Sequence, residues 1–343
     1  MPANLSPEYK SAEAAFKKAR EPKERLDCLR EMLRAIPKHK GTEHLQADIK
    51  TRIKHLTEEL ATGKKGAGRG GPPQTIRPEG AAQIALIGAP NVGKSTLHAR
   101  LTGSHSEAGP YPYTTKVPVP GMLPFEDIHF QVVDLPPISS DHKLPWISNA
   151  LQPANACMLV VDLREAACVD HVVAIRELLT EKRITLLERW DRAAEDPGAG
   201  TSPDELADPF AIWLPTLLVA NKADQIPTPE DELEVLQELL GVRYPAVWVS
   251  AMTGEGLDRI GPWLFQALQI VRVYTKAPGQ PPDKDRPFTV RRGETVLDVA
   301  LLVHRELADS LKYARLWGSG QFKGQQVSRD HPVSDGDILE LHA

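Results

Sequence analysis

The sequence predicts an α/β protein in which a mostly parallel sheet carries helices on both faces. Two observations support this. From Ala82 onward, short apolar runs of strand length alternate with stretches of helical period, and such alternation is typical of parallel sheets joined through helices. In addition, the apolar run ending at Ile87 leads into a glycine-rich loop and then a helical stretch from Thr96. That strand–loop–helix order is typical of a phosphate-binding loop.

The expected strands of the central domain are Ile84–Ile87, His129–Val133, Met158–Asp162, Thr216–Asn221 and Ala246–Ser250, and the main expected helices are Asp170–Leu187, Pro229–Leu240 and Leu257–Leu268. The segment Asp191–Pro209 contains Gly, Pro and acidic residues without an apolar period. We therefore expect a surface insertion at about 190–210. We assign residues 81–274 to this domain.

A basic helical hairpin is predicted for residues 1–62. One apolar stripe runs from Leu26 to Ile36 and a second from Leu45 to Leu60, both at helical spacing, and a Pro/Gly break separates them. Each stripe gives a helix one apolar face, and the short break favours antiparallel packing. Residues 63–80 are rich in Gly, Lys, Arg and Pro without periodicity, which predicts a flexible linker.

The C-terminal residues 275–343 predict a small α+β domain of the ubiquitin-like (β-grasp) kind. After a Pro-rich stretch, Phe288–Val290 fits a strand and Glu294–Leu307 a helix, and two short strands follow. Strand, turn, helix and strands within a short segment are typical of such a domain.

Composition excludes several classes of protein. The three cysteines lie far apart without a CxxC pair, which argues against a disulfide scaffold or a zinc site. The apolar runs are shorter than a bilayer span, and the N-terminus is polar, so we expect no membrane segment and a cytoplasmic protein.

Charge is distributed unevenly along the chain. Residues 1–80 hold 17 Lys and Arg against 11 Asp and Glu, a net charge of +6, whereas the whole chain carries −5. A basic arm on an acidic body indicates contact with a polyanion, RNA first of all. The alternative is a solvated hairpin whose lysines only keep it soluble.

The glycine-rich loop matches the pattern GxxxxGK[ST]. Its expected nucleotide-binding residues are Gly88, Ala89, Pro90, Asn91, Val92, Gly93, Lys94, Ser95 and the following Thr96. Backbone N–H groups of such a loop wrap phosphates. Lys94 is expected at the β- and γ-phosphates as a catalytic group, and the Ser95 hydroxyl on Mg²⁺.

A second motif, Asn221-Lys222-Ala223-Asp224, indicates the base. It ends an apolar strand, where α/β sheets place ligands. The Asp224 carboxylate can accept from N1–H and the exocyclic amine of guanine, whereas adenine presents an acceptor at N1. Asn221 would brace the loop and Lys222 would lie along the base. Ser250 and Ala251 end the next strand and are expected to offer a backbone N–H to the base.

A third motif, Asp134-Leu135-Pro136-Pro137, departs from the usual DxxG. Asp134 is expected to hold Mg²⁺. Pro137 stands where a glycine N–H ordinarily binds the γ-phosphate, and proline has no N–H. Ile138 then stands where signalling GTPases carry a water-orienting glutamine. Either this switch is arranged differently, or sensing of the γ-phosphate is weakened.

Two further positions are candidates for catalysis. The amide oxygen of Asn91 could coordinate a K⁺ ion between the phosphates in the place of an arginine finger; otherwise Asn91 only shapes the loop. In Tyr111-Pro-Tyr-Thr-Thr-Lys116, a threonine would complete the Mg²⁺ shell. Thr115 is chosen over Thr114 as the metal-binding and catalytic residue.

Gly88–Ser95, Tyr111–Lys116, Asp134–Pro136 and Asn221–Asp224, in this order, resemble the Obg-type GTPases, in particular the developmentally regulated GTP-binding branch. The tail, with Ala314–Gly318 and Asp335–Glu340, resembles a TGS domain. The resemblance implies a translation-factor-class protein that binds GTP or GDP, associates with ribosomes or RNA, and shows K⁺-stimulated hydrolysis. A regulatory protein is a further expected partner. The region between Asp162 and Leu214 does not supply the extra domain that the eukaryotic members insert, which predicts a bacterial or archaeal relative.

Two functions remain open from the sequence. One is an active GTPase that depends on Mg²⁺ and K⁺. The other is a GTP-binding adaptor with little hydrolysis, in which Pro137 uncouples the switch and the two outer domains perform recognition. An ATPase would require the base motif to lack its aspartate, and Asp224 is present.

Overall fold

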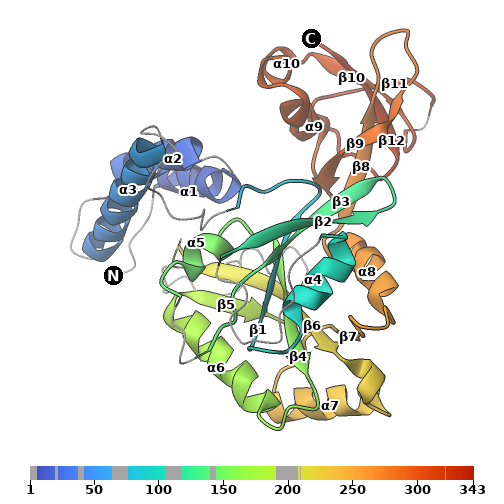
Figure 1. Ribbon diagram of the computed structural model, residues 1–343. Coiled ribbons are helices and arrows are strands. Elements are labelled where there is room, and N and C mark those ends of the chain that lie inside the picture. The colour runs from blue at the N-terminus through green and yellow to red at the C-terminus, as the bar shows by residue number, and fades with distance from the viewer. Residues whose placement is uncertain are drawn as a thin grey trace.

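The computed structural model describes residues 6–19, 22–37, 42–63, 76–104, 117–139, 144–190, 208, 210–320 and 322–343. In this part the chain forms an N-terminal helical body, a central α/β domain and a C-terminal α+β domain (Figure 1). No helix within these ranges is long and apolar enough to cross a membrane.

The central sheet confirms the predicted α/β class. Its strands are β1 (Gln83–Gly88), β2 (Val119–Phe125), β3 (Ile128–Asp134), β4 (Ala156–Asp162), β5 (Ile184–Leu187), β6 (Ile212–Asn221) and β7 (Ala246–Trp248). They are ordered β2-β3-β1-β4-β6-β5, and β7 pairs with the second half of β6. Only β2 and β3 run antiparallel. Strands β1 and β4 are buried along their whole length, as expected of apolar runs covered on both faces.

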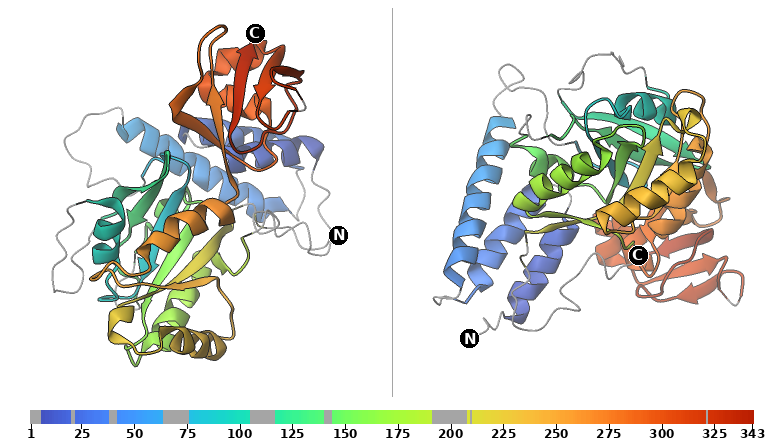
Figure 2. Two further views of the ribbon diagram at one scale, coloured as in Figure 1. Left: turned by 90° about the vertical axis from the view of Figure 1, so that its right-hand side faces the viewer. Right: turned by 90° about the horizontal axis from the view of Figure 1, so that it is seen from below.

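Helices cover both faces of this sheet. They are α4 (Lys94–Thr102), α5 (Ile147–Leu151), α6 (Cys168–Glu181), α7 (Pro229–Leu240) and α8 (Ile260–Ala267). Helices α4 and α8 both contact β2, while α6 and α7 contact each other across the sheet from them (Figures 1 and 2). Each helix buries an apolar stripe in one continuous core with the strands, so the sheet supports rigid loops at both of its ends.

The C-terminal domain has its own five-stranded sheet and core. Its elements are β8 (Ile270–Thr275), β9 (Asp283–Arg291), α9 (Val296–Val303), α10 (Arg305–Ser310), β10 (Tyr313–Trp317), β11 (Gln325–Val327) and β12 (Asp337–His342). The order is β11-β10-β12-β8-β9. Strand β8 pairs with β9 and β12, so the domain begins about five residues before the expected boundary at 275. Strand β9 likewise starts before the expected strand Phe288–Val290, inside the Pro-rich stretch that precedes it.

The N-terminal body contains three helices where the two apolar stripes predicted a hairpin. They are α1 (Pro7–Lys18), α2 (Pro22–Ala35) and α3 (Glu43–Gly63); α2 and α3 are the two expected helices, and α1 is additional. Figure 2 shows the three side by side, next to the central sheet. Tyr9, Ala12 and Phe16 recur at helical spacing and bury the inner face of α1 against α2, and Ser6 caps its first turn.

Contacts from the central domain hold this helical body. Phe210, at the end of the expected insertion, is 5% exposed in the core of the helical body. It meets the Phe16 ring edge-on at 6.0 Å, and the Arg52 guanidinium lies 4.0 Å from its ring. Arg183 pairs with Asp48 of α3 at 2.9 Å. The rest of the insertion, residues 191–207 and 209, lies outside the described residues.

Part of the expected flexible linker is ordered against the sheet. Ala81 N donates to His129 O at 2.8 Å, and Gln83 Nε2 donates to Ile76 O at 3.1 Å. Gln131 Nε2 also donates to Arg77 O. The stretch 76–80 therefore runs along β3 because two buried glutamines satisfy its backbone.

Candidate functional site

The predicted site residues meet at the carboxyl edge of the central sheet. The glycine-rich loop follows β1, Asp134 ends β3, Asn221 ends β6, and Ser250 comes shortly after β7. These strands are mutually parallel, so their carboxyl ends share one edge. Open α/β sheets bind their ligands at that edge.

Two glycines of the loop are required by close approach. A Cβ on Gly88 would lie 2.5 Å from Val160 O, and one on Gly93 would lie 2.4 Å from Asn221 Nδ2. Gly93 also has φ +89°, a conformation that other residues rarely adopt. Gly93 directly precedes α4, so the loop delivers the chain into the helix N-terminus, where backbone N–H groups favour anions.

Lys94 is buried inside the loop. Its side chain is 5% exposed, and its Nζ donates to Gly88 O at 3.1 Å and to Ala89 O at 2.8 Å. Burial lowers the pKa of Lys94 to about 8, and the nearby Asp134 carboxylate acts in the opposite direction. Two carbonyl oxygens of the loop thus hold the Lys94 ammonium in place.

Ser95 and Asp134 form the second part of the site. The Ser95 hydroxyl donates to Asp134 Oδ2 at 2.7 Å. The parallel register of β1 and β3 places Asp134 beside Leu86, and its side chain is 1% exposed. A hydroxyl and a carboxylate are hard oxygen donors of the kind that Mg²⁺ takes in company with substrate phosphates and water. The two residues fit that ion.

Asn221 connects two loops of the site. Its Nδ2 donates to Val92 O at 2.9 Å in the glycine-rich loop, and its Oδ1 accepts from Ala251 N at 3.0 Å. The side chain is 2% exposed. Because one buried amide satisfies both loops, the phosphate loop and the loop after β7 are held in a fixed relation.

Lys222 adds a connection that sequence patterns did not reveal. Its Nζ donates to Asn91 O at 2.8 Å and pairs with Asp162 Oδ2 at 2.8 Å. Asp162 also pairs with Arg164 at 3.0 Å. Hydrogen bonds from Arg164 and Lys222 outweigh desolvation and lower the pKa of Asp162. Asp162 stands opposite Asn221 in the register of β4 and β6.

Asp224 projects into solvent beside this group. It lies in the short 3-10 turn Ala223–Gln225 that follows Lys222. Its pKa is lowered, first because the Ser250 side chain donates to it, and Arg164 contributes as a neighbouring positive charge. An exposed ionised carboxylate at the strand edge is available to accept from a ligand.

The remaining predicted positions differ in what the structure describes. Asn91 has φ +62° and is exposed at the tip of the loop. Thr114 and Thr115, like the whole stretch 105–116, lie outside the described residues. Pro136 and Pro137 are buried, and Ile138 N donates to Gly88 O at 3.2 Å.

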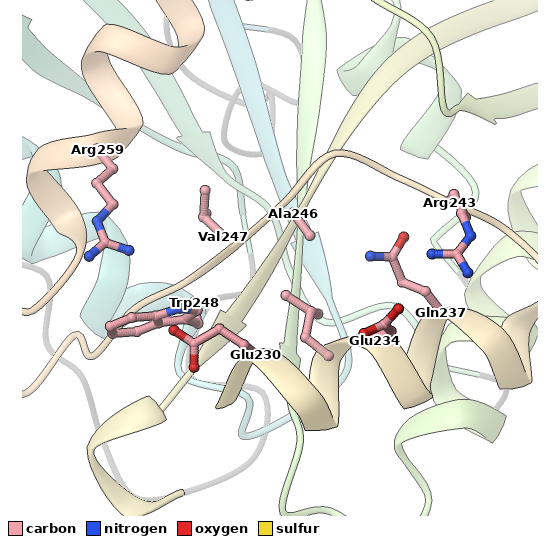
Figure 3. A pocket seen from close by; sticks show the side chains of 9 residues that line it. Glu230, Glu234, Gln237, Arg243, Ala246, Val247, Trp248 and Arg259 are labelled. Carbon is pink, nitrogen blue, oxygen red and sulfur yellow. The ribbon is translucent and has the colours of Figure 1, made fainter. Parts of the chain in front are cut away.

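A separate groove lies between α7 and β7. Figure 3 shows Glu230 and Glu234 of α7 on one side, with Trp248 and Arg259 opposite, where Arg259 lies 4.6 Å from the Trp248 ring. Its lining includes none of the predicted site residues. The predicted site therefore lies at the strand ends, apart from this groove.

Comparisons with known proteins match both the central and the C-terminal domain. Residues 83–189 match a family model described as 50S ribosome-binding GTPase, and residues 271–343 match that of the TGS domain. An uncharacterized GTP-binding protein of Methanocaldococcus jannaschii is 28% identical, with 93% of this chain and 92% of that protein covered. Developmentally-regulated GTP-binding protein 1 of Xenopus laevis is 27% identical, with 89% and 94% covered.

The fold has a counterpart among solved structures. The YchF GTPase of Schizosaccharomyces pombe aligns with 79% of this chain and 100% of its own, with a TM-score of 0.51 at 14% identity. At that identity the likeness concerns the fold alone.

Proposed function

We propose that this chain hydrolyses GTP with Mg²⁺ and K⁺ in association with a ribosome or RNA. The premise is that it belongs to the developmentally regulated GTP-binding proteins and joins a P-loop GTPase domain to a TGS domain. The observation that carries the proposal is the convergence of three motifs, distant in sequence, at one edge of the sheet. Phosphoryl transfer requires positioning and charge neutralisation at such a place.

The phosphate half of the site is assigned to the loop and α4. When a nucleotide binds, the Lys94 ammonium leaves its two carbonyl acceptors and donates to β- and γ-phosphate oxygens. These oxygens bind an ammonium more strongly because they are charged. Backbone N–H groups of residues 88–96 surround the phosphates. Ser95 and Asp134 would hold Mg²⁺, which supplies further neutralisation of charge on the phosphates. Thr115 is assigned as the remaining protein ligand.

The base half is assigned to the loops after β6 and β7. Asp224 accepts from guanine N1–H and the exocyclic amine, which adenine cannot offer. Asn221 holds this region to the phosphate loop through Val92 O. Ala251, braced by Asn221 Oδ1, places the Ser250–Ala251 backbone near the base edge. The hydrogen bond from Ser250 lowers the pKa of Asp224, which favours the ionised carboxylate.

Asn91 is assigned to K⁺. It is exposed at the loop tip, and Lys222 Nζ fixes its backbone through Asn91 O, so its amide oxygen can face the phosphates. A bound K⁺ would supply the positive charge that other GTPases obtain from an arginine finger.

Association with ribosomes or RNA rests on the charge of residues 1–80, which favours contact with a phosphate backbone. The description of the matching GTPase family as ribosome-binding supports the same partner. The TGS domain is the second surface proposed for recognition, and a regulatory protein is a further partner.

A GTP-binding adaptor with little hydrolysis is the second candidate, and Pro137 favours it. Without an N–H at position 137, the switch lacks the usual donor to the γ-phosphate.

Hydrolysis by the full chain in KCl and in NaCl, with ATP as control substrate, tests the proposal. We expect GTP-only turnover about tenfold faster in KCl, because K⁺ adds charge stabilisation in the transition state, and loss of turnover in Lys94→Ala. Tight GTP binding without turnover in either salt would favour the adaptor. Failure to bind GTP at all would contradict both.

A further inference from the structure

The segment after Asp134 continues along β1 as far as the phosphate loop. Leu135 N donates to Leu86 O, and Ile138 N donates to Gly88 O, both at 3.2 Å. Leu135 is fully buried and Ile138 is 5% exposed. Hydrogen bonds at Leu135 and Ile138 therefore hold residues 135–138 along the end of β1 as far as Gly88. The two buried side chains set the direction of this backbone.

Few N–H groups are available in this segment. Pro136 and Pro137 have none, and the N–H of Leu135 is used within the sheet. The next N–H along the chain is that of Ile138, one residue after the position where the DxxG pattern has its glycine. This N–H donates directly to Gly88 O of the loop.

Ile138 shares its acceptor with the phosphate-binding lysine. Gly88 O accepts from Lys94 Nζ at 3.1 Å and from Ile138 N at 3.2 Å. Both donors lie within 3.2 Å of one oxygen, and a carbonyl oxygen has two lone pairs to serve them. A phosphate oxygen that draws Lys94 away would therefore act on the same carbonyl that holds the Ile138 N–H.

We propose that the backbone N–H of Ile138 replaces the one missing at Pro137 as the switch donor to the γ-phosphate of GTP, with Gly88 O as its alternative acceptor. The inference rests on the proposed GTP site. A charged phosphate oxygen is a stronger acceptor than a neutral carbonyl, so GTP draws the N–H from Gly88. GDP lacks the γ-phosphate and leaves it there. The two prolines fix φ at positions 136 and 137, so the reorientation of the N–H involves ψ of Pro137 and φ of Ile138.

Affinities of the full chain for GDP and for a non-hydrolysable GTP analogue test this. Ile138→Pro removes the N–H, and Ile138→Val keeps it. We expect Ile138→Pro to weaken analogue binding about tenfold or more relative to GDP, since the lost bond is to a charged group, and Ile138→Val to keep the wild-type ratio. Pro137→Gly/Ile138→Pro moves the N–H back by one residue and should restore the ratio in part.

A backbone ester at position 138, introduced as the α-hydroxy analogue of isoleucine, removes the same N–H without adding a ring. It is the decisive variant if Ile138→Pro fails to fold, and unchanged GDP affinity shows that the site is intact. An unchanged analogue-to-GDP ratio in the ester variant would overturn the inference. If the wild-type chain bound neither nucleotide, the proposed function would fail instead.

Discussion

Asp162 shows how one buried carboxylate can organise the base side of the site. It ends β4 beside Asn221, and its pairing with Lys222 at 2.8 Å leaves that side chain 25% exposed. Lys222 has φ +66° and reaches back to Asn91 O. The lysine thus connects the base motif to the phosphate loop, and Asp162 fixes where it lies.

Substituting Asp162→Asn removes the charge and keeps the size of the side chain. We expect it to weaken GDP binding about fivefold, because the loss of a partly buried ion pair costs about 1 kcal/mol. Glu165→Gln, which removes the same charge from an exposed residue three positions on, is the matched control and should leave affinity unchanged. Calorimetric titration of both variants measures the difference. Equal losses in both would show a general charge effect.

The motifs with fixed spacing could be predicted from the sequence, whereas Asp162 could not. Lys94, Asn221 and Asp224 each occur in a pattern whose chemistry is local. Asp162 ends an ordinary apolar run, and its role depends on the register that sets β4 beside β6. A signal was available: an acidic residue ends the strand next to the one that carries the base motif, and parallel strand ends gather functional groups.

At the scale of elements, the β2–β3 hairpin joins the central domain to the C-terminal sheet. Arg272 of β8 pairs with Asp127 at 3.0 Å and with Glu126 in the turn between β2 and β3, and with Asp335 at 2.7 Å. Tyr274 Oη donates to Asp127 at 2.5 Å. Strand β3 ends at Asp134, so the hairpin connects this contact to the end of the site that holds the Ser95–Asp134 hydrogen bond.

Arg272→Ala leaves the carboxylates of this interface without their common partner. We expect the thermal unfolding midpoint to fall by about 5 °C, corresponding to about 2 kcal/mol for a partly buried network. The pKa of Asp335 is lowered because Arg272 donates to it. The contribution is therefore present above the ordinary carboxyl pKa and is lost as the pH falls below it. Calorimetric scans at neutral and acid pH measure both effects.

Arg286→Ala removes an exposed arginine of β9 in the same domain and is the control for net charge. An equal shift in the Arg286 variant, or an Arg272 effect that persists unchanged in acid, would contradict the assigned interface.

Two elements were mispredicted from the sequence, each for its own physical reason. Helix α1 contributes only three buried apolar residues, a stripe too short to stand out before its partners are known. Strand β8 follows α8 after Leu268 and Gln269, so no break in composition separates the two domains. By contrast, β1 and β4 are buried on both faces, and their continuous apolar runs were sufficient to predict them as strands.

At the scale of the whole molecule, the three-helix body presents exposed lysines on a chain whose net charge is −5. Lys50 and Lys54 are exposed on α3, one helical turn apart. Phe210 and the Arg183–Asp48 pair attach this body to the central domain. Cations held on a docked helix have a fixed spacing. A polyanion binds them at a lower entropic cost than it binds the same cations on a free arm, because the helix is already ordered.

Lys50→Gln/Lys54→Gln tests whether this face contacts RNA. If both lysines contact phosphates, RNA affinity falls and the slope of log affinity against log salt decreases in magnitude by about 1.4, since each neutralised phosphate of a single strand contributes about 0.7. Lys182→Gln/Arg243→Gln removes two exposed cations from the central domain and should leave the slope unchanged. Filter binding of the full chain to single-stranded ribosomal RNA fragments across a salt series measures it. Equal slopes in the two double variants would show that the face acts only as a solvated surface, because a non-contacting lysine releases no counterion on binding.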